Sequence, residues 1–249
     1  MKIKDAIRTL LFKKKDLVFN QLYTKWGNQL NYEQIHMEYP RPQLRRSDYR
    51  ILNGYWNYNI TKNVKKPEQY DGKILVPFSP ECILSGVNRQ VQPDEILWYE
   101  RMLFIENIPD NKKCILHFGA VDQICEIFIN DKSVKQHVGG YLPFSVDITK
   151  YLIEGNNILS VKVKDTSDTS YHSRGKQKLK RGGMFYTAQS GIWQSVWMEW
   201  VPDMYITSLR IRPLVDESQV RISINLSQSM NSQDKRNQSD MFTVDIYDK

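Results

Sequence analysis

Residues 114–129 read CILHFGAVDQICEIFI, and their hydrophobicity alternates with a period of two residues. Such alternation is typical of strands that have one buried face and one exposed face. The residues expected to point inward are Cys114, Leu116, Phe118, Cys125, Ile127 and Ile129. This stretch therefore predicts two half-buried strands, the second of which ends at the turn-forming pair Asn130-Asp131.

The same pattern continues on both sides of this stretch, from about residue 50 onward. In segment 158–164, Leu159, Val161 and Val163 are expected to point inward, and Ser160, Lys162 and Lys164 outward. Segment 192–201 is apolar on both faces, which predicts a central strand. Many short strands without strand–helix alternation favour an all-β fold, a β-sandwich of the jelly-roll type.

The periodicity divides the chain into three parts. Residues 1–38 have a loosely helical apolar spacing that Lys13–Lys15 and Asp16 interrupt, so we expect a partly helical extension outside the core. Residues 39–203 hold the predicted sandwich. Residues 204–249 contain three more candidate strands, at 205–211, 220–226 and 242–247. A sandwich needs about seven strands, so we expect 204–249 to be the start of a second, incomplete sandwich.

Composition narrows the class of protein. The chain has 249 residues, 41% of them hydrophobic, which is typical of a globular protein, and no apolar run is long enough to span a membrane. Asp5 and Arg8 stand where a signal peptide would be apolar, and three cysteines without metal-ligand spacing suit a reducing compartment, so we expect a cytoplasmic protein. The net charge is +7, and the first 50 residues carry most of it; with no recognition motif, nucleic-acid binding is not favoured.

A series of short motifs carries a resemblance to a known family. In chain order they are YPRPQ at 39–43, LNGYW at 52–56, VPFSPE at 76–81, LSG at 84–86, HFGAVD at 117–122, NDK at 130–132, HVGGY at 137–141, RGKQ at 174–177 and SGIW at 190–193. They resemble the N-terminal region of the family 2 glycoside hydrolases, which include β-galactosidases, β-glucuronidases and β-mannosidases. Asp131 departs from the family pattern, which usually has glycine there.

The resemblance implies a galactose-binding-like jelly roll followed by an immunoglobulin-like sandwich and a catalytic (β/α)8 barrel. Retaining glycosidases need two carboxyl groups about 5–5.5 Å apart. In this family both are barrel glutamates, the first of them in an Asn-Glu pair, and this sequence contains no Asn-Glu dipeptide. We therefore expect no catalytic residue, no metal and no cofactor in this chain.

Two aspartates are candidates for contact with a sugar. The segment 165–171, DTSDTSY, resembles one that carries an aspartate holding a sugar hydroxyl or a nearby cation in some β-galactosidases. Asp168 matches best, and Asp165 is the second candidate. A carboxylate can accept hydrogen bonds from two neighbouring hydroxyls and fix the orientation of the ring. The alternative is that both aspartates cap turns after the strand at 158–164.

The next loop adds three further candidates, Arg174, Lys176 and Gln177. They could donate hydrogen bonds to sugar hydroxyls or to a substrate carboxylate. They could equally form a solvated basic loop that packs against the barrel. Trp193, Trp197 and Trp200 leave a similar choice between core and inter-domain contacts and a platform for sugar stacking.

We therefore expect the non-catalytic N-terminal portion of a family 2 glycosidase, with a carbohydrate substrate and the absent barrel as partners. We also expect self-association through unpaired strands after residue 204. A free-standing carbohydrate-binding module is the main alternative, and a basic protein that binds nucleic acid through residues 1–50 is a third.

Overall fold

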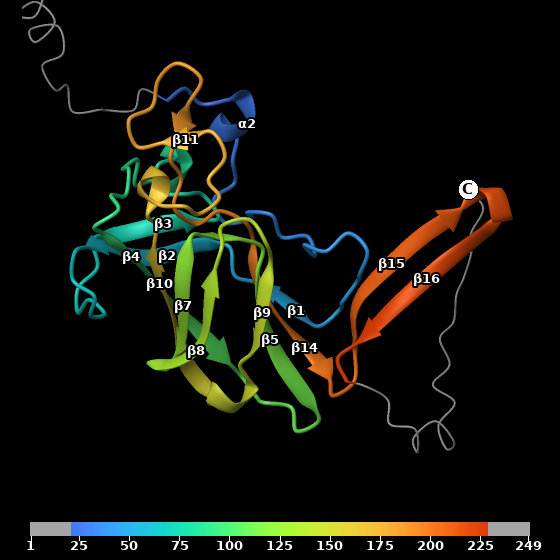
Figure 1. Ribbon diagram of the computed structural model, residues 1–249. Helices are drawn as coiled ribbons and strands as arrows, with labels where there is room; N and C mark the ends of the chain where they lie inside the picture. Colours follow the sequence, from blue (N-terminus) through green and yellow to red (C-terminus); the bar gives the residue numbers. More distant parts are fainter. Residues whose placement is uncertain (1–20, 229–249) are drawn as a thin grey trace, which may run out of the picture.

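The computed structural model describes residues 21–228, and in this part of the chain two antiparallel sheets face each other (Figure 1). The four-stranded sheet has the order β1 (Tyr49–Ile51), β14 (Val196–Pro202), β5 (Lys112–Phe118) and β9 (Phe144–Asp147). The six-stranded sheet has the order β3 (Gly72–Val76), β2 (Gly54–Thr61), β4 (Ile96–Ile105), β10 (Gly155–Lys164), β7 (Ile124–Ile129) and β8 (Lys132–Val138). This arrangement confirms the predicted all-β sandwich.

Three strand pairs and five helical turns outside the two large sheets complete the described part. Three two-stranded pairs are β6 (Val121–Asp122) with β13 (Gly191–Ile192), β11 (Gln177–Lys178) with β12 (Tyr186–Thr187), and β15 (Ile206–Leu214) with β16 (Gln219–Leu226). The helical turns are α2 (Lys25–Asn28), η1 (Ile83–Ser85), η2 (Thr149–Tyr151), η3 (Ser167–Thr169) and η4 (Val215–Glu217).

The core lies between the two sheets and contains the residues that the period-two pattern assigned to it. All six inward positions of 114–129 are buried in one cluster. However, β5 and β7 belong to different sheets, because the chain crosses the sandwich at residues 119–123. Cys114 and Cys125 therefore lie in different sheets, and both are free, buried thiols whose pKa burial raises to about 12.

Two further predicted strands are confirmed, one of them with a correction. β14 lies between β1 and β5, as expected for a segment that is apolar on both faces. In β10, Leu159, Val161 and Val163 join the core, but Ser160, expected to be exposed, is only 1% exposed. Ser160 lies on the outer face of the sheet, opposite the bulky Phe128 of β7, and alternation alone does not reveal a large cross-strand neighbour.

The N-terminal part packs more closely than expected. Thr24 caps α2 by accepting a hydrogen bond from the Gly27 N–H at 3.0 Å. Ile35 is only 2% exposed, which corrects the expectation that residues 1–38 stay outside the core. A single buried side chain leaves no periodic pattern in the sequence. Residues 1–20, also expected to be partly helical, lie outside the described residues.

Residues 35–46, here called the strap, run along the outer face of the four-stranded sheet. Tyr39 Oη donates a hydrogen bond to Oε2 of the buried Glu199 at 2.6 Å, and Arg41 Nη2 lies 2.5 Å from Glu199 Oε1. Further along, Arg46 Nη2 donates to the carbonyl oxygen of Ile206 at 2.6 Å. The strap therefore connects the sandwich to the first strand of the following hairpin.

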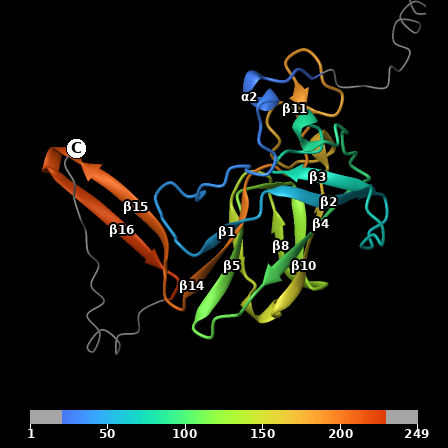
Figure 2. The same cartoon turned by 180° about the vertical axis from the view of Figure 1, so that it is seen from behind.

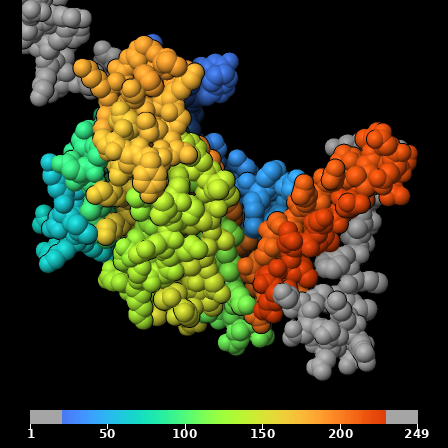
Figure 3. All heavy atoms as spheres, viewed as in Figure 1, coloured from blue at the N-terminus to red at the C-terminus, as the bar shows by residue number. Residues whose placement is uncertain are grey.

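The β15–β16 hairpin projects from the sandwich (Figures 1 and 2), and the space-filling view shows it as an arm (Figure 3). Its register places on one face Leu209, Ile211, Pro213, Val220, Ile222 and Ile224. Two of the three strands expected after residue 204 are thus confirmed. The third, at 242–247, lies outside the described residues, and the immunoglobulin-like assignment stays a prediction.

Candidate functional site

Several of the sequence motifs meet at one end of the sandwich, at the top of Figure 1. The Ser190 N–H donates a hydrogen bond to Oε2 of Glu81 at 3.1 Å, which joins motif 190–193 to motif 76–81. Trp193 Nε1 donates to the carbonyl oxygen of Gly140 at 2.7 Å, which joins the same motif to 137–141. Motifs separated by more than one hundred residues therefore build a single surface.

Three buried carboxyl groups lie beneath this surface. Burial raises the pKa of Glu81 to about 8, although N–H bonds from Val91 and Ser190 act in the opposite direction. Burial and the nearby Asp165 carboxylate raise the pKa of Asp122 to about 7. Glu81 and Asp122 are therefore at least partly protonated near neutral pH, and this limits the repulsion between the neighbouring carboxyl groups.

Asp165 is one of these buried groups, and both of its oxygens are occupied. Oδ1 accepts a hydrogen bond from the Ser167 N–H at 2.7 Å, and Oδ2 accepts one from Ser190 Oγ at 2.8 Å. Burial raises its pKa, and these two bonds partly oppose that shift. Asp165 therefore fixes the start of the loop against the strand-forming segment that follows it.

Asp168 has a different environment. It lies in η3 and is half-buried, and its Oδ1 accepts a long hydrogen bond, 3.4 Å, from the Leu179 N–H. Among the described residues, Oδ2 has no hydrogen-bond partner. Of the two candidate aspartates, only Asp168 has a carboxylate oxygen without a hydrogen-bond partner in the described part of the chain.

The three candidates in the basic loop have separate roles in its structure. Gln177 Oε1 accepts a hydrogen bond from the Gln189 N–H at 2.7 Å, so this side chain fastens the loop. Arg174 Nη1 donates to the carbonyl oxygen of Ser170 at 3.1 Å. The Lys176 side chain is exposed. All five candidates lie within residues 165–177, and within that set Lys176 and Arg174 supply the positive charge.

Tyr141 connects this loop to a neighbouring groove. A Cβ atom added to Gly175, whose φ is +62°, would lie 3.8 Å from Tyr141 Oη. On its other side, the Tyr141 ring meets the Trp193 ring edge to face, with centroids 6.1 Å apart. Tyr141 is 41% exposed, so a ligand at this end of the sandwich can reach it.

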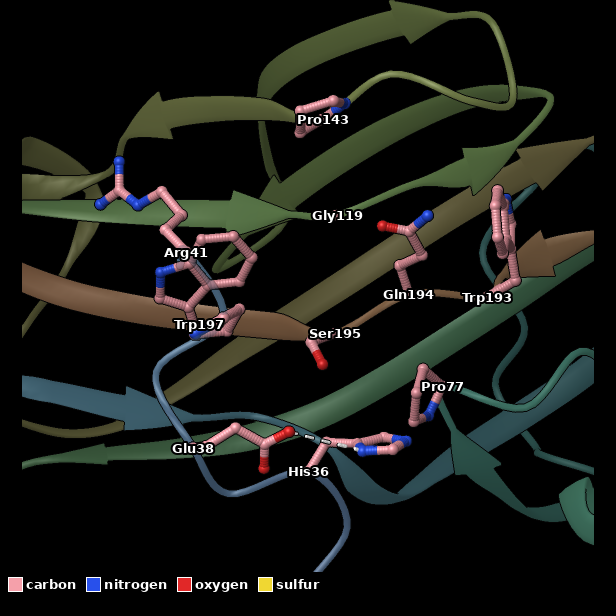
Figure 4. Close-up of a pocket in the computed structure, with 11 residues that line it drawn as sticks. His36, Glu38, Arg41, Pro77, Gly119, Pro143, Trp193, Gln194, Ser195 and Trp197 are labelled. Carbon is pink, nitrogen blue, oxygen red and sulfur yellow. Dashed lines mark ion pairs between the residues drawn. The ribbon is translucent and has the colours of Figure 1, made fainter. Parts of the chain in front are cut away.

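The groove has a volume of about 430 Å³ (Figure 4). Trp193, Gln194 and Ser195 form one wall, and the strap residues His36 and Glu38 form the opposite wall. Gln194 is exposed and offers an amide, whereas Trp193 offers a partly exposed indole. An aromatic surface beside planar polar groups can hold a polar ring such as a sugar, and it can equally receive another protein surface.

Sequence reasoning did not single out Glu81, Asp122 or Tyr141, although each stands inside one of the quoted motifs. The signal that could have found them is their position within those motifs. In the described part of the chain, no group of three or more His, Cys, Asp or Glu side chains could hold a metal ion. None of the helices described is long and apolar enough to cross a membrane.

Comparisons with known proteins agree with this arrangement. The sequence profile described as "Glycosyl hydrolases family 2, sugar binding domain" matches residues 57–202. A β-galactosidase of Thermoanaerobacter pseudethanolicus is 28% identical over 113 residues, which are 45% of this chain and 14% of that protein. A β-glucuronidase of Streptococcus agalactiae is 28% identical over 112 residues, 44% of this chain and 18% of that protein.

Among solved structures, a β-glucuronidase from an uncultured Clostridium species superposes with a TM-score of 0.57 at 25% identity. The superposition covers 74% of this chain and 35% of that chain. The chain therefore spans only a small part of the length of the proteins that it matches.

Proposed function

This chain belongs to glycosyl hydrolase family 2 and carries that family's sugar binding domain at residues 57–202, and on this premise we propose that it is the N-terminal, non-catalytic portion of a β-glycosidase. The two carboxyl groups that cleave the glycosidic bond would then lie outside these 249 residues. The much greater length of the matched relatives supports this division of labour.

The proposed substrates are β-galactosides, β-glucuronides or related β-linked sugars. The names of the β-galactosidase and β-glucuronidase relatives support this class. The positive charge of the loop that carries Arg174 and Lys176 is compatible with a uronic acid, whose carboxylate needs a cationic partner.

The observation that carries the proposal is the free oxygen of Asp168. This residue is half-buried, its Oδ1 accepts a long hydrogen bond from the Leu179 N–H, and its Oδ2 has no hydrogen-bond partner in the described part of the chain. A carboxylate placed in this way can accept hydrogen bonds from a sugar and fix its orientation. Asp165 would support it by holding the loop through Ser190.

Docking of the catalytic part is the second proposed role. Arg174 and Lys176 would face the rim of that part, and Gln177 would hold their loop in place through the Gln189 N–H. Self-association through the exposed face of the β15–β16 hairpin, giving a homo-oligomer, is part of the same proposal.

A free-standing carbohydrate-binding module is the second candidate. The observation that favours it is the groove beside Trp193, which has both an indole and an exposed amide on one wall. A cytoplasmic location is proposed for either function, because all three cysteines are free and two of them are buried in the core.

In the test, para-nitrophenyl β-galactoside and β-glucuronide are titrated into the purified chain. Calorimetry measures binding, and absorbance measures any release of nitrophenol. We expect weak binding and no release of nitrophenol. Asp168→Asn replaces a charged acceptor and is expected to weaken binding about tenfold, whereas Glu106→Gln on the exposed far surface leaves it unchanged.

Release of nitrophenol by the chain would contradict the non-catalytic assignment. Equal affinity of Asp168→Asn and the unmodified chain would remove Asp168 from the site. Tight binding that needs no other domain would favour the free-standing module.

A further inference from the structure

The last strands of the two sheets, β8 and β9, lie beside each other on one side of the sandwich. In the described part of the chain, β8 pairs only with β7, and β9 pairs only with β5, so each has a free edge. His137 of β8 stacks on Phe144 of β9, with ring centroids 4.1 Å apart. This contact brings the two free edges together at one end of the strands.

A groove of about 760 Å³ lies along these two edges. Val134 of β8, Val146 of β9 and Tyr151 of η2 line it, and all three are half-buried and pack against the core. The floor of the groove is therefore apolar and continuous with the interior of the sandwich. The volume is within the range of ligand sites, about 300–1,000 Å³.

The groove is rich in positive charge. The charged residues that line it are Lys112, Lys113, Lys135, Lys150, Asp147 and Asp203. Lys112 and Lys113 each have an aspartate oxygen within 3.3 Å of Nζ. Lys135 and Lys150 are exposed and have no acidic partner in the described part of the chain. These two lysines are therefore available to an anionic group that enters the groove.

The two aspartates of the groove already have donors within the chain. Asp203 Oδ1 lies 3.3 Å from Lys113 Nζ. Asp147 Oδ1 accepts hydrogen bonds from the Thr149 N–H at 3.0 Å and from Thr149 Oγ1 at 2.5 Å. An incoming acidic group therefore meets the uncompensated charge of Lys135 and Lys150.

The backbone of β9 offers hydrogen-bonding groups to the groove. The Ile148 N–H donates to the carbonyl oxygen of Cys114 at 2.9 Å, so this pair is bonded across to β5. Along an antiparallel ladder, such pairs alternate with pairs that do not exchange hydrogen bonds. Ser145 and Asp147 belong to the second kind, and their backbone N–H and C=O groups point away from β5. Both residues line the groove.

We infer that this groove binds an extended acidic peptide segment of a partner protein, which adds a strand to the free edge of β9. Ser145 and Asp147 would pair with its backbone, and its alternate side chains would reach the lysines on one side and the apolar floor on the other. Lysines on a free edge normally deter pairing with other strands. Toward an acidic strand the same charges are attractive, so Lys135 and Lys150 select the partner.

This inference is independent of the function proposed above. The groove shares no lining residue with the groove of Figure 4, and it does not involve the loop at 165–190. Asp168→Asn is therefore expected to leave peptide binding intact. Failure at the loop site and failure at this groove are distinguishable.

The test uses the acetylated and amidated heptapeptide EVEVEVE and the full chain. Fluorescence anisotropy of the dye-labelled peptide measures affinity, and hydrogen exchange followed by NMR measures protection of single amides. We expect the peptide to slow exchange of the Ser145 and Asp147 amides. Lys135→Glu combined with Lys150→Glu should weaken binding at least about tenfold. Lys164→Glu makes the same kind of charge change at an exposed position outside the groove and should leave binding unchanged.

Three further probes separate the possible results. The peptide KVKVKVK has the opposite charge and should not bind. The peptide EVEPEVE keeps the charge but loses a backbone donor, so it should bind at least about tenfold more weakly. Equal binding of EVEPEVE, or binding of EVEVEVE without protection of the Ser145 and Asp147 amides, would overturn strand addition. Binding of heparin without binding of EVEVEVE would replace the acidic peptide with a general polyanion and would also overturn the inference.

Discussion

Nε2 of His117 lies 3.1 Å from Oε1 of Glu199, in a buried cluster that joins the four-stranded sheet to the strap. The His117 ring also stacks on Trp197, with centroids 4.7 Å apart. Burial alone would raise the pKa of Glu199, but hydrogen bonds from His117, Tyr39 and Arg41 outweigh it and lower that pKa to about 2. The ionised carboxylate is therefore the form that the fold requires.

Glu199→Gln is expected to lower the free energy of unfolding by about 3 kcal/mol at neutral pH, because Arg41 loses its buried anionic partner. The native pKa of Glu199 lies below its unfolded value of about 4.3, so its contribution is present above that value and is lost as the pH falls toward 2. The difference in the free energy of unfolding between Glu199→Gln and the unmodified chain should therefore shrink as the pH falls from about 4.3 to about 2. Urea unfolding at several pH values measures this difference.

Glu106→Gln provides the control for this experiment, since Glu106 is exposed and its replacement should change stability by less than about 0.5 kcal/mol. A constant difference between the Glu199 variant and the unmodified chain from pH 7 to pH 2 would contradict the assigned pKa.

Glu81→Gln is expected to change the pH dependence of stability in the opposite sense. The native pKa of Glu81, about 8, lies above its unfolded value, so the folded state binds the extra proton. Its contribution is lost as the pH rises from about 4.3 to about 8, by at most about 1.4 kcal/mol per pH unit. The variant should show a flatter stability curve over this window in the same urea experiments, and parallel curves would show that Glu81 is ionised in the fold.

Gly191→Ala is expected to destabilise the chain by about 3 kcal/mol or more. Gly191 has φ of +79°, and an added Cβ would overlap the hydroxyl of Tyr99 and lie 2.8 Å from Leu97 Cδ2. Tyr99→Phe removes the overlapping oxygen, so the double variant should lose less than the sum of the two single losses. Thermal unfolding of the four proteins tests this coupling, and strict additivity would contradict it.

Ile222→Lys is expected to reduce self-association of the chain. Ile222 is 40% exposed on the apolar face of the hairpin, opposite Ile211, which is 54% exposed. A charge on this face opposes its burial against another copy. Ser223→Lys adds the same charge on the other face of β16 and should have little effect. Sedimentation velocity compares them, and equal behaviour of the two variants would exclude this face as the contact.

Sequence periodicity predicted most of the sandwich because each strand buries one face. The strands around Cys114 and Cys125 illustrate both the strength and the limit of this signal. Their inward residues were predicted correctly, but the sheet to which each strand belongs depends on the crossing at 119–123, which alternation does not encode. The burial of Ile35 and Ser160 likewise results from contacts with distant residues.

The candidate site was predictable only in part. The motifs pointed to the loop of Asp165 and Asp168, but the sequence could not tell that one carboxylate is fully hydrogen-bonded and the other keeps a free oxygen. The pairing of Tyr141 with Trp193 depends on two loops about fifty residues apart meeting in space. Such convergence is a property of the fold and has no local signature.

The groove of Figure 4 takes one wall from the strap and the other from residues 193–197, so neither segment forms it alone. A molecule bound between them would hold the strap more firmly against the sandwich, because its binding free energy would add to the free energy of the contacts that already attach the strap. Protection of the strap from protease by a bound compound would therefore report occupancy of the groove without any assay of chemistry.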